Sequence, residues 1–552
     1  MHAKPHTSAA LAALLAASLS GLTSCAPEES ARIEDYLGPA PGAPGQAPRG
    51  AADGPTSRPA GPVATTRAAG APATRPAWPL RLTVSEAVVM ALENNAALRV
   101  ERMNPVIRRT FEEQERAVFD PVLSAQLQRQ RAKTRQPLGA GRATALSEST
   151  TGQVAVDQVL PTGTTVGLSA DATAQDAAAG GKDLYGSRIA LTATQALLRG
   201  AGLEVNLASL KQARLDTLSS KYQLRGFAES LAADTEEAYW DHVLARRQIE
   251  IYQSSLDLAR KQYDDTKERV RIGKLAETEV AAAEAEVALR QEAMINAHSA
   301  LSSARLRLIR LVNPPGAKAF ETPLGLESLP QPGDQRIDEA GLHVQLAMRM
   351  RPELNEARLL IQRDELELVK TRNGLLPRLD LFITLGKSGY ANSFGRSVRE
   401  LDGPGYEVLA GLSAEFSPLN RDARARHRRA NWTRRQAKQS LANLAQLVEM
   451  DVRGAHIELL RAREQTRATA ATRKLQEVKL RVESEKLAIG KSTSLLVAQV
   501  QRDLLQSQIG EVEALVSYLK ALVELRRLEG SLLEFRGIVS PGREPVAPPA
   551  RP

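Results

Sequence analysis

Apolar positions change their period several times along this chain, and the changes outline its elements. From Leu82 to Arg116, apolar residues recur at helical spacing. An alternation with a period of two follows, in which Leu123, Ala125 and Leu127 are separated by polar residues. The pattern therefore predicts a helix that leads directly into a β-strand.

Three more segments alternate in the same way. A returning strand is expected at 189–193, and a second pair of strands at 379–385 and 408–416. Each segment has one apolar face and one polar or small face, which is typical of a sheet between two environments. A bilayer on one side and water on the other would fit, and so would a soluble sandwich. A further alternating stretch at 153–170 is either a surface hairpin or additional strands.

Two proline-free stretches predict helices far longer than those of ordinary globular domains. The first covers 203–272, about 70 residues or roughly 105 Å of helix, and a second arm continues after Gly273 to residue 312. The other stretch covers 421–489 and continues after Gly490 to about residue 535. Each glycine lies where a long helix should reverse into its partner, because glycine readily supplies a left-handed turn residue.

Coiled-coil packing between neighbouring long helices is predicted by apolar positions separated alternately by three and four residues, with charged residues outside the seam. These positions are Ile249, Tyr252, Leu256, Ala259, Tyr263, Thr266 and Val270, and then Leu505, Ile509, Val512, Val516, Leu519 and Val523.

The chain resembles itself at two places, in the same order. Residues 98–127 resemble residues 354–383, and the tripeptide Ile-Gly-Lys occurs at 272–274 and again at 489–491. We therefore predict an internal duplication. The first repeat covers 81–312 and the second covers 339–536, with a proline-rich linker at 313–338.

The N-terminus predicts export. Lys4 precedes an apolar run at 9–22, which has the length of a signal-peptide core and is too short to span a bilayer. Cys25 follows in a context that resembles a lipobox, and it is the only cysteine. We predict a signal peptide at 1–24 and lipidation of Cys25, the alternative being an ordinary signal peptide with an incidental cysteine.

Two terminal segments are predicted to have no fixed structure. Residues 25–80 are rich in Pro, Ala, Gly, Thr and Arg, which cannot bury a core, so we expect a lipidated tether. Residues 537–552 are expected to form an unstructured C-terminal tail. The apolar run of the signal sequence is too short to span a bilayer, and no other segment reaches the ~18 continuous apolar residues of a transmembrane helix, so any membrane span must be built from strands.

Charge and chemistry narrow the function by exclusion. The formal charge is +9, but the arginines are scattered along helices and are not interleaved with aromatic residues, so we predict no nucleic-acid partner. The seven histidines have no metal-ligand spacing, and there is no phosphate-binding loop. We therefore predict no enzyme, no metal and no cofactor.

Seven short stretches carry a resemblance to a known family. They are Leu-Thr-Val-Ser-Glu-Ala at 82–87, Phe-Asp-Pro-Val-Leu at 119–123, Leu-Leu-Arg-Gly at 197–200, Glu-Ala-Tyr-Trp at 237–240, Ile-Gly-Lys-Leu at 272–275, Arg-Pro-Glu-Leu at 351–354 and Leu-Leu-Pro at 375–377. In this order, over about residues 82–536, the chain resembles the TolC-like outer-membrane efflux protein family.

The resemblance implies a mostly α fold with a membrane β-barrel portion. Long coiled-coil helical hairpins form a periplasmic α-barrel, and a homotrimer shares one outer-membrane β-barrel. The mid-chain linker and the C-terminal segment form an equatorial region around the helices. The four strand segments predicted above would supply twelve strands to such a trimer.

The function implied is that of a passive outer-membrane channel in a tripartite efflux or type I secretion system. The subunit would be lipid-anchored, would extend into the periplasm, and would meet an inner-membrane pump through a periplasmic adaptor, or membrane fusion protein. The alternative is a structural coiled-coil lipoprotein of the cell envelope without a pore.

The resemblance also implies that the two helix reversals dock the adaptor, although a plain helix–helix turn would use the same glycine. The docking candidates are Ile272, Gly273, Lys274, Leu275, Ile489, Gly490, Lys491 and Ser492.

Family members often carry acidic residues just after the reversal, where a ring of acids at the periplasmic aperture selects cations. The aperture candidates in this chain are Glu279, Leu495, Leu496 and Gln499. Only the first copy has an acid, so Glu279 is a weak candidate for such a ring. Leu495 or Leu496 would form either a hydrophobic constriction or part of a packed helix seam.

Seven arginines between positions 421 and 435 follow the last predicted strand. They would either attract anionic lipid headgroups or form a solvated helix start.

Overall fold

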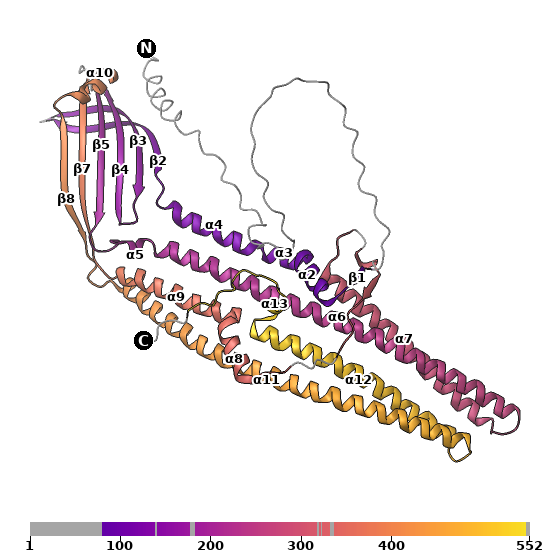
Figure 1. The fold of residues 1–552 in the computed structure, drawn as a ribbon. Helices are drawn as coiled ribbons and strands as arrows, with labels where there is room; N and C mark the ends of the chain where they lie inside the picture. Colours follow the sequence, from indigo (N-terminus) through magenta and orange to yellow (C-terminus); the bar gives the residue numbers. More distant parts are fainter. Residues whose placement is uncertain are drawn as a thin grey trace, which may run out of the picture.

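The computed structural model describes residues 80–138, 141–176, 183–316, 319–321, 323–331 and 336–547. In these residues the chain is mostly helical, with one large β-sheet at one end and long helices extending away from it (Figure 1). The predicted signal peptide, Cys25 and the tether up to residue 79 lie outside the described residues.

The helix predicted from Leu82 consists of three consecutive helices, α2 (Val84–Asn94), α3 (Ala96–Glu101) and α4 (Met103–Ala117). Thr83 and Glu86 form a capping box that starts α2. The break after α2 is caused by Asn95, whose backbone is extended and whose side chain accepts hydrogen bonds from the first amides of α3.

The large sheet has six antiparallel strands, the four that the alternation predicted and two that the sequence left open. The ambiguous stretch at 153–170 supplies the additional strands, because it forms a hairpin that turns at Gly163. Gly163 has a φ of +86°, and a Cβ there would lie 2.2 Å from the carbonyl oxygen of Gly200, so only glycine fits this turn. In sheet order the strands are β2 (Val122–Leu138), β3 (Gly141–Val159), β4 (Thr164–Asp176), β5 (Leu184–Ala196), β7 (Arg378–Ala391) and β8 (Tyr406–Glu415).

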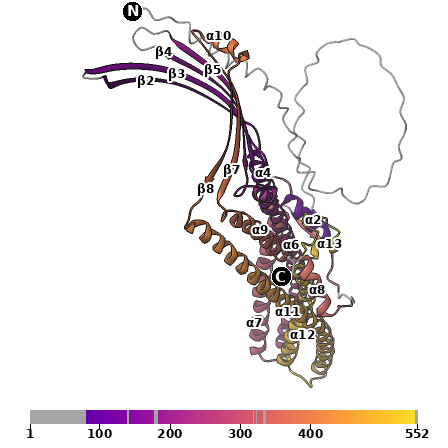
Figure 2. The ribbon, with the colours of Figure 1, turned by 90° about the vertical axis from the view of Figure 1, so that its left-hand side faces the viewer.

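At the end of the sheet away from the long helices, the chain between β7 and β8 forms two short helices, α10 (Phe394–Arg399) and η3 (Glu400–Asp402). Figure 2 shows that the strands curve together, with α10 packed against their far end. The buried hydroxyls of Ser187 in β5 and Ser397 in α10 lie 2.8 Å apart and fix this contact.

The long helices follow the prediction with two differences. A short helix α5 (Leu203–Asn206) precedes α6 (Ala208–Arg271), and the last arm ends early. That arm ends at Gly530, whose φ is +71° and which lies directly against the backbone of Met350 and Arg351. The other elements of this part are α7 (Thr278–Val312), α8 (Ala340–Met350), α9 (Pro352–Asn373), α11 (Arg421–Ala488), α12 (Ser494–Glu529) and α13 (Leu532–Phe535).

Below the sheet, α4, α6, α9 and α11 lie side by side, and further away the layer continues as the hairpins α6/α7 and α11/α12 (Figure 1). The predicted coiled-coil seams are confirmed, since Leu256, Ala259, Leu505, Ile509 and Val516 are buried between these helices. No described helix has both the length and the apolar character that crossing a membrane requires.

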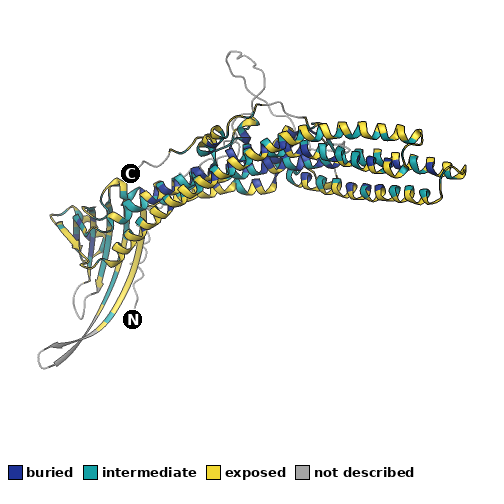
Figure 3. Ribbon diagram, turned by 90° about the horizontal axis from the view of Figure 1, so that it is seen from below, coloured by how far each residue is buried: buried dark blue, intermediate teal, exposed yellow. Residues whose placement is uncertain are grey.

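The core of the molecule is its middle, where buried residues gather among the helices (Figure 3). The linker contributes a short helix η2 (Ala319–Glu321) and a strand β6 (Leu324–Leu326), which pairs in parallel with β1 (Leu80–Leu82). Tyr239 of α6 is fully buried here. Its hydroxyl donates to the carbonyl of Leu82 at 3.0 Å and accepts from the amide of Ser328 at 2.9 Å. One side chain of α6 thus holds the end of β1 and the segment that follows β6.

The C-terminal segment departs from the prediction of an unstructured tail. Gly542 and Val546 lie within hydrogen-bonding distance of helices α6 and α9. The buried Arg225 donates to Gly542 at 3.2 Å, to Gly530 at 2.7 Å and to the carboxylate of Glu534 at 2.6 Å. A sequence rich in proline and glycine is held here because polar side chains of the helices satisfy its carbonyl groups.

The stability of this middle region should depend on the protonation of Glu229. This carboxylate is 2% exposed, and burial raises its pKa to about 8, against the lowering effect of Arg225. A raised pKa means that the folded state holds the proton more tightly than the unfolded state, so the stabilisation is lost as the pH rises toward about 8. We expect a lower unfolding temperature at about pH 8.5 than at about pH 5.5, and a smaller difference in Glu229→Gln. Glu250→Gln, which alters an exposed carboxylate of α6, should leave the difference unchanged.

Candidate functional site

One face of the large sheet carries an uninterrupted row of large apolar side chains. The strand register aligns one residue of each strand in this row, and all of them are 37% to 64% exposed in the single chain. The row consists of Leu123, Val156, Leu168, Leu191, Leu385 and Val408. A soluble surface rarely exposes a continuous apolar band of this kind, so this face requires a cover.

The opposite face of the sheet is polar. The neighbouring row contains Ser124, Ser169 and Glu407, together with small residues of the other strands. Arg188 and Glu407 form an ion pair across this face at 2.8 Å. The sheet therefore has one apolar and one polar face, as the alternation predicted.

The two reversals of the long hairpins have the same backbone geometry. At the first, the amide of Gly273 donates to Val270 and that of Lys274 to Arg269. At the second, the amides of Gly490 and Lys491 make the equivalent bonds. Both glycines have positive φ, 72° and 74°, which completes a Schellman motif at each helix end.

The predicted docking residues lie together at the end of the molecule furthest from the sheet, on neighbouring hairpins (Figure 1). Ile272 and Ile489, the residues before the glycines, are 52% and 68% exposed although they are large and apolar. Lys274 and Lys491 are also exposed. The fold thus presents the same exposed isoleucine and lysine twice at one end, which a turn alone does not need.

The four aperture candidates differ in their environments. The carboxylate of Glu279 accepts a hydrogen bond from the hydroxyl of Ser494, so the two reversals are linked directly. Leu495 and Leu496 are 68% and 42% exposed, and Gln499 is also exposed. The buried seam positions after the second reversal are instead Val497 and Val500. In this chain Leu495 and Leu496 are therefore not seam residues.

The sequence reasoning missed two polar residues that shape the second reversal. Glu483 accepts from Ser492 at 3.1 Å and from Lys486 at 2.6 Å, and the bond from Lys486 lowers the pKa of Glu483. Ser494 supplies the link to the other hairpin. A carboxylate nine residues before a serine gives no periodic signal, because the helix must reverse before the two side chains meet.

Both layers of the molecule end in unpaired edges. The sheet ends at β2 on one side and at β8 on the other. In the helical layer, α4 and α7 pack on α6, α11 packs on α9, and these edge helices carry exposed apolar residues. These residues are Met103, Ile107 and Phe111 on α4, Leu289 and Ile295 on α7, and Met450, Ile457 and Leu475 on α11.

Neither a metal site nor a site for lipid headgroups is evident among the described residues. Within the described residues, no three His, Cys, Asp or Glu side chains are grouped as ligands for a metal ion. Of the seven arginines after the last strand, Arg426 pairs with Asp422, Arg434 with Glu365, and Arg435 lies over the ring of Trp432. Their attraction to lipid headgroups stays a prediction.

Comparison with known proteins identifies relatives of this chain. Residues 343–531 match the family described as outer membrane efflux protein. The alkaline protease secretion protein AprF of Pseudomonas aeruginosa is 27% identical over 239 residues, which cover 41% of this chain and 49% of AprF. The match thus spans about half the length of this curated relative.

Solved structures share the fold. The outer-membrane channel OprN superposes with a TM-score of 0.62 at 17% identity, over 81% of this chain and 90% of OprN. The CmeC outer membrane channel of Campylobacter jejuni gives 0.61 at 13% identity, over 81% and 86%. The MtrE outer membrane channel of Neisseria gonorrhoeae gives 0.55 at 17% identity, over 81% and 89%.

Alanine at a reversal should destabilise the chain through the backbone alone. No atom lies within 4 Å of a Cβ placed at Gly490, so Gly490→Ala should cost only the left-handed conformation, about 1–2 kcal/mol. Gly454 lies inside α11 with equally open space, so Gly454→Ala should stabilise by about 0.5–1 kcal/mol. Thermal unfolding of both variants, with hydrogen exchange near Lys491, measures the contrast. Equal effects of the two substitutions would contradict the conclusion that the positive φ of Gly490 causes the loss of stability.

Proposed function

We propose that this chain belongs to the outer membrane efflux protein family and is one subunit of a passive channel across the outer membrane. It would serve a tripartite efflux or type I secretion system. The observation that carries the proposal is the apolar row across all six strands, joined directly to helices of about 100 Å. A structural lipoprotein without a pore gives no reason for an exposed apolar sheet face.

The dimensions of the apolar face suit an outer membrane. This face begins at Tyr406, the first residue of β8, and reaches Phe416, which directly follows the strand; these residues are 76% and 72% exposed. Ten residues of strand span roughly 33 Å, or about 25 Å along the membrane normal at the usual strand tilt. Aromatic residues at both ends of a band of this height are typical of transmembrane β-barrels.

Closure by further copies explains the unpaired edges. With six alternating strands, β2 and β8 run in opposite directions, so β8 of one copy can pair antiparallel with β2 of the next. Three copies would then supply eighteen strands to one β-barrel, enough to enclose an aqueous lumen. The same rotation would bring the exposed apolar residues of α4 and α7 against those of α11 and close the helices into an α-barrel.

We also propose that the chain arose by duplication, with repeats at 81–312 and 339–536. In support, a helix leading into strands and then into a long hairpin occurs twice, as α4, β2–β5, α6/α7 and as α9, β7–β8, α11/α12. Lipidation of Cys25 after removal of residues 1–24 would anchor the N-terminal tether at 25–80 in the same membrane.

The partners follow from the far end of the molecule. The chain carries no phosphate-binding loop, so the energy for transport would come from an inner-membrane pump. A periplasmic adaptor would dock on the two reversals, whose exposed isoleucine and lysine pairs offer apolar anchors beside positive charge. The link between Glu279 and Ser494 would help to hold the periplasmic aperture closed.

A charge on the apolar face should impair membrane assembly. Leu412 is 65% exposed on this face, and arginine there would cost about 2–4 kcal/mol near the membrane midplane. We expect Leu412→Arg to lower the amount of assembled protein in the outer-membrane fraction. Ser413→Arg places the same charge on the other face of the same strand and should assemble normally. Equal assembly of both variants would contradict the proposal that the face of Leu412 contacts lipid and the face of Ser413 does not.

Closure and conduction can be tested together with engineered cysteines. In a Cys25→Ser background, one cysteine is placed on β2, at Leu123, Ala125 or Leu127, and one on β8 at Leu412. The two strands are opposite edges of one sheet, so a disulfide between them must join different copies. We expect oxidation to yield a ladder that ends at three chains, and the cross-linked species to conduct ions in planar bilayers.

Each negative result has a separate meaning. If no β2 position cross-links, the edge-to-edge closure is wrong. Covalent trimers that do not conduct ions would contradict the proposed channel function and favour a structural role. This holds if they stay non-conducting with Glu279→Gln, which removes the link between the two reversals.

A further inference from the structure

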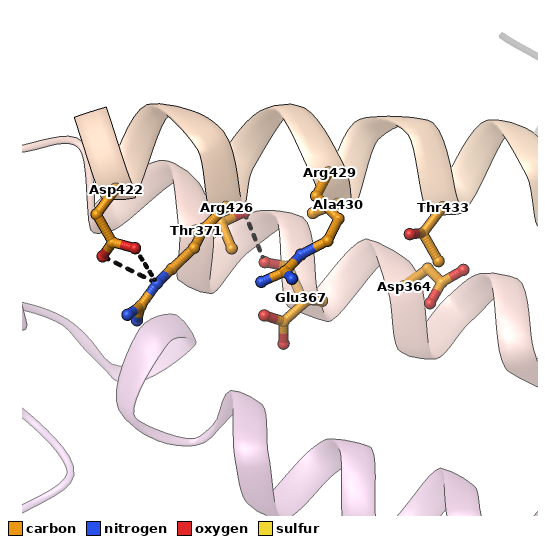
Figure 4. Close-up of a pocket in the computed structure, with 8 residues that line it drawn as sticks. All are labelled: Asp364, Glu367, Thr371, Asp422, Arg426, Arg429, Ala430 and Thr433. Atoms are coloured by element: carbon orange, nitrogen blue, oxygen red, sulfur yellow. Dashed lines mark hydrogen bonds and ion pairs between the residues drawn. The ribbon is translucent and has the colours of Figure 1, made fainter. Parts of the chain in front are cut away.

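A pocket of about 440 Å³ lies between α9 and α11 (Figure 4), the two helices that precede and follow strands of the large sheet and lie just below it (Figure 1). It takes no part in the functions proposed above. Its lining is almost entirely polar and comes from both helices: Asp364, Glu367, Thr371, Asp422, Arg426, Arg429, Ala430 and Thr433.

Most charges in the pocket are already paired. Asp422 and Arg426 form an ion pair at 3.0 Å along α11, visible as dashed lines in Figure 4. Glu367 lies 3.5 Å from the ammonium of Lys370 and accepts a hydrogen bond from Gln212. Two groups of opposite charge remain, Asp364 on α9 and Arg429 on α11.

Asp364 is the unusual member. It is 9% exposed, and its Oδ2 atom is enclosed and has no hydrogen-bond partner among the described residues. An enclosed carboxylate without a partner is unfavourable by several kcal/mol. Burial accordingly raises the pKa of Asp364, with Arg363 opposing the change. A ligand with a positive, hydrogen-bonding group would supply the partner that this carboxylate lacks.

Arg429 offers the opposite charge to the same space. Its side chain is exposed and extends between the two helices in Figure 4, and no ion pair joins it to any carboxylate of the described chain within 4.0 Å. The hydroxyls of Thr371 and Thr433 also line the pocket. The pocket therefore holds an unpaired acceptor and an unpaired donor too far apart to neutralise each other.

We propose that this pocket binds a small zwitterion, with its ammonium group at Asp364 and its carboxylate at Arg429. A simple cation would leave Arg429 unpaired, and a simple anion would leave the enclosed Asp364 unpaired. A metal ion fits less well, since the carboxylates of the pocket are not grouped as metal ligands in the described structure. The bond between a guanidinium and a carboxylate gives such a site its orientation.

The pocket opens on the side of α9 that faces away from the C-terminal segment. Asp364 follows Asn355 by nine residues, which places the two on opposite sides of α9, about half a turn apart. Asn355 accepts from the amide of Val546 and so marks the side covered by the C-terminal segment. The pocket faces the other way, which would be the inner wall of a closed helical barrel.

Calorimetric titration of the full-length protein in detergent tests the proposal. The probes are glycine, 4-aminobutyrate and 6-aminohexanoate, because the spacing of the two charges selects among them. Butylamine and butyrate each carry only one of the charges. We expect at least one zwitterion to bind about ten-fold or more tightly than either single-charge compound.

Substitutions test whether binding depends on Asp364 and Arg429 and not on a neighbouring carboxylate. Asp364→Asn and Arg429→Gln should each weaken binding of the preferred zwitterion at least about ten-fold, with unfolding temperatures showing that both variants fold. Glu365→Gln changes the adjacent carboxylate, which pairs with Arg434, and should bind as wild type does. Absence of binding by every zwitterion, equal binding by butylamine, or wild-type affinity in Asp364→Asn would each overturn the proposal. None of these outcomes depends on conductance, so the channel is judged separately.

Discussion

The register of the six-stranded sheet is the constraint on which the rest of this structure depends. Because side chains alternate between faces, a slip of one residue at any strand would move a leucine or valine of the apolar row to the polar face. The register instead aligns apolar residues from Leu123 to Val408 across every strand. This single alignment creates a face that water cannot satisfy and leaves β2 and β8 as edges that a single chain cannot pair.

The long helices extend the layer of the sheet and keep the same two unpaired edges. Four of them continue from the sheet as one layer, with edges on the same sides as the edges of the sheet. Long helices with narrow seams have little core of their own, so the middle of the molecule must hold them together. There, buried polar groups such as Tyr239 and Arg225 join segments that are far apart in sequence. Polar groups suit this task because their hydrogen bonds fix direction as well as proximity.

The two hairpins end alike and then differ. Their Schellman turns are equivalent bond for bond, since the geometry needs only a glycine and a helix end. Beyond the turns, Glu279 on one hairpin meets Ser494 on the other, and the exposed Leu495 and Leu496 directly after the second turn have no counterpart after the first. The glycine turns are thus repeated in both hairpins, whereas the side chains after the turns, which a gate would use, differ between the hairpins.

The sequence alone determined the features that are periodic or local. The alternation predicted both faces of the strands, the three-and-four spacing predicted the helix seams, and the two glycines predicted the reversals, because each of these depends on neighbours within one element. Tertiary structure alone decided the rest. The strands β3 and β4 joined the sheet because of pairing across it, residues 542–546 were held by side chains more than 180 residues away, and Asp364 was enclosed by a helix from another part of the chain. Such contacts leave no period in the sequence, since they depend on which distant segments the fold brings together.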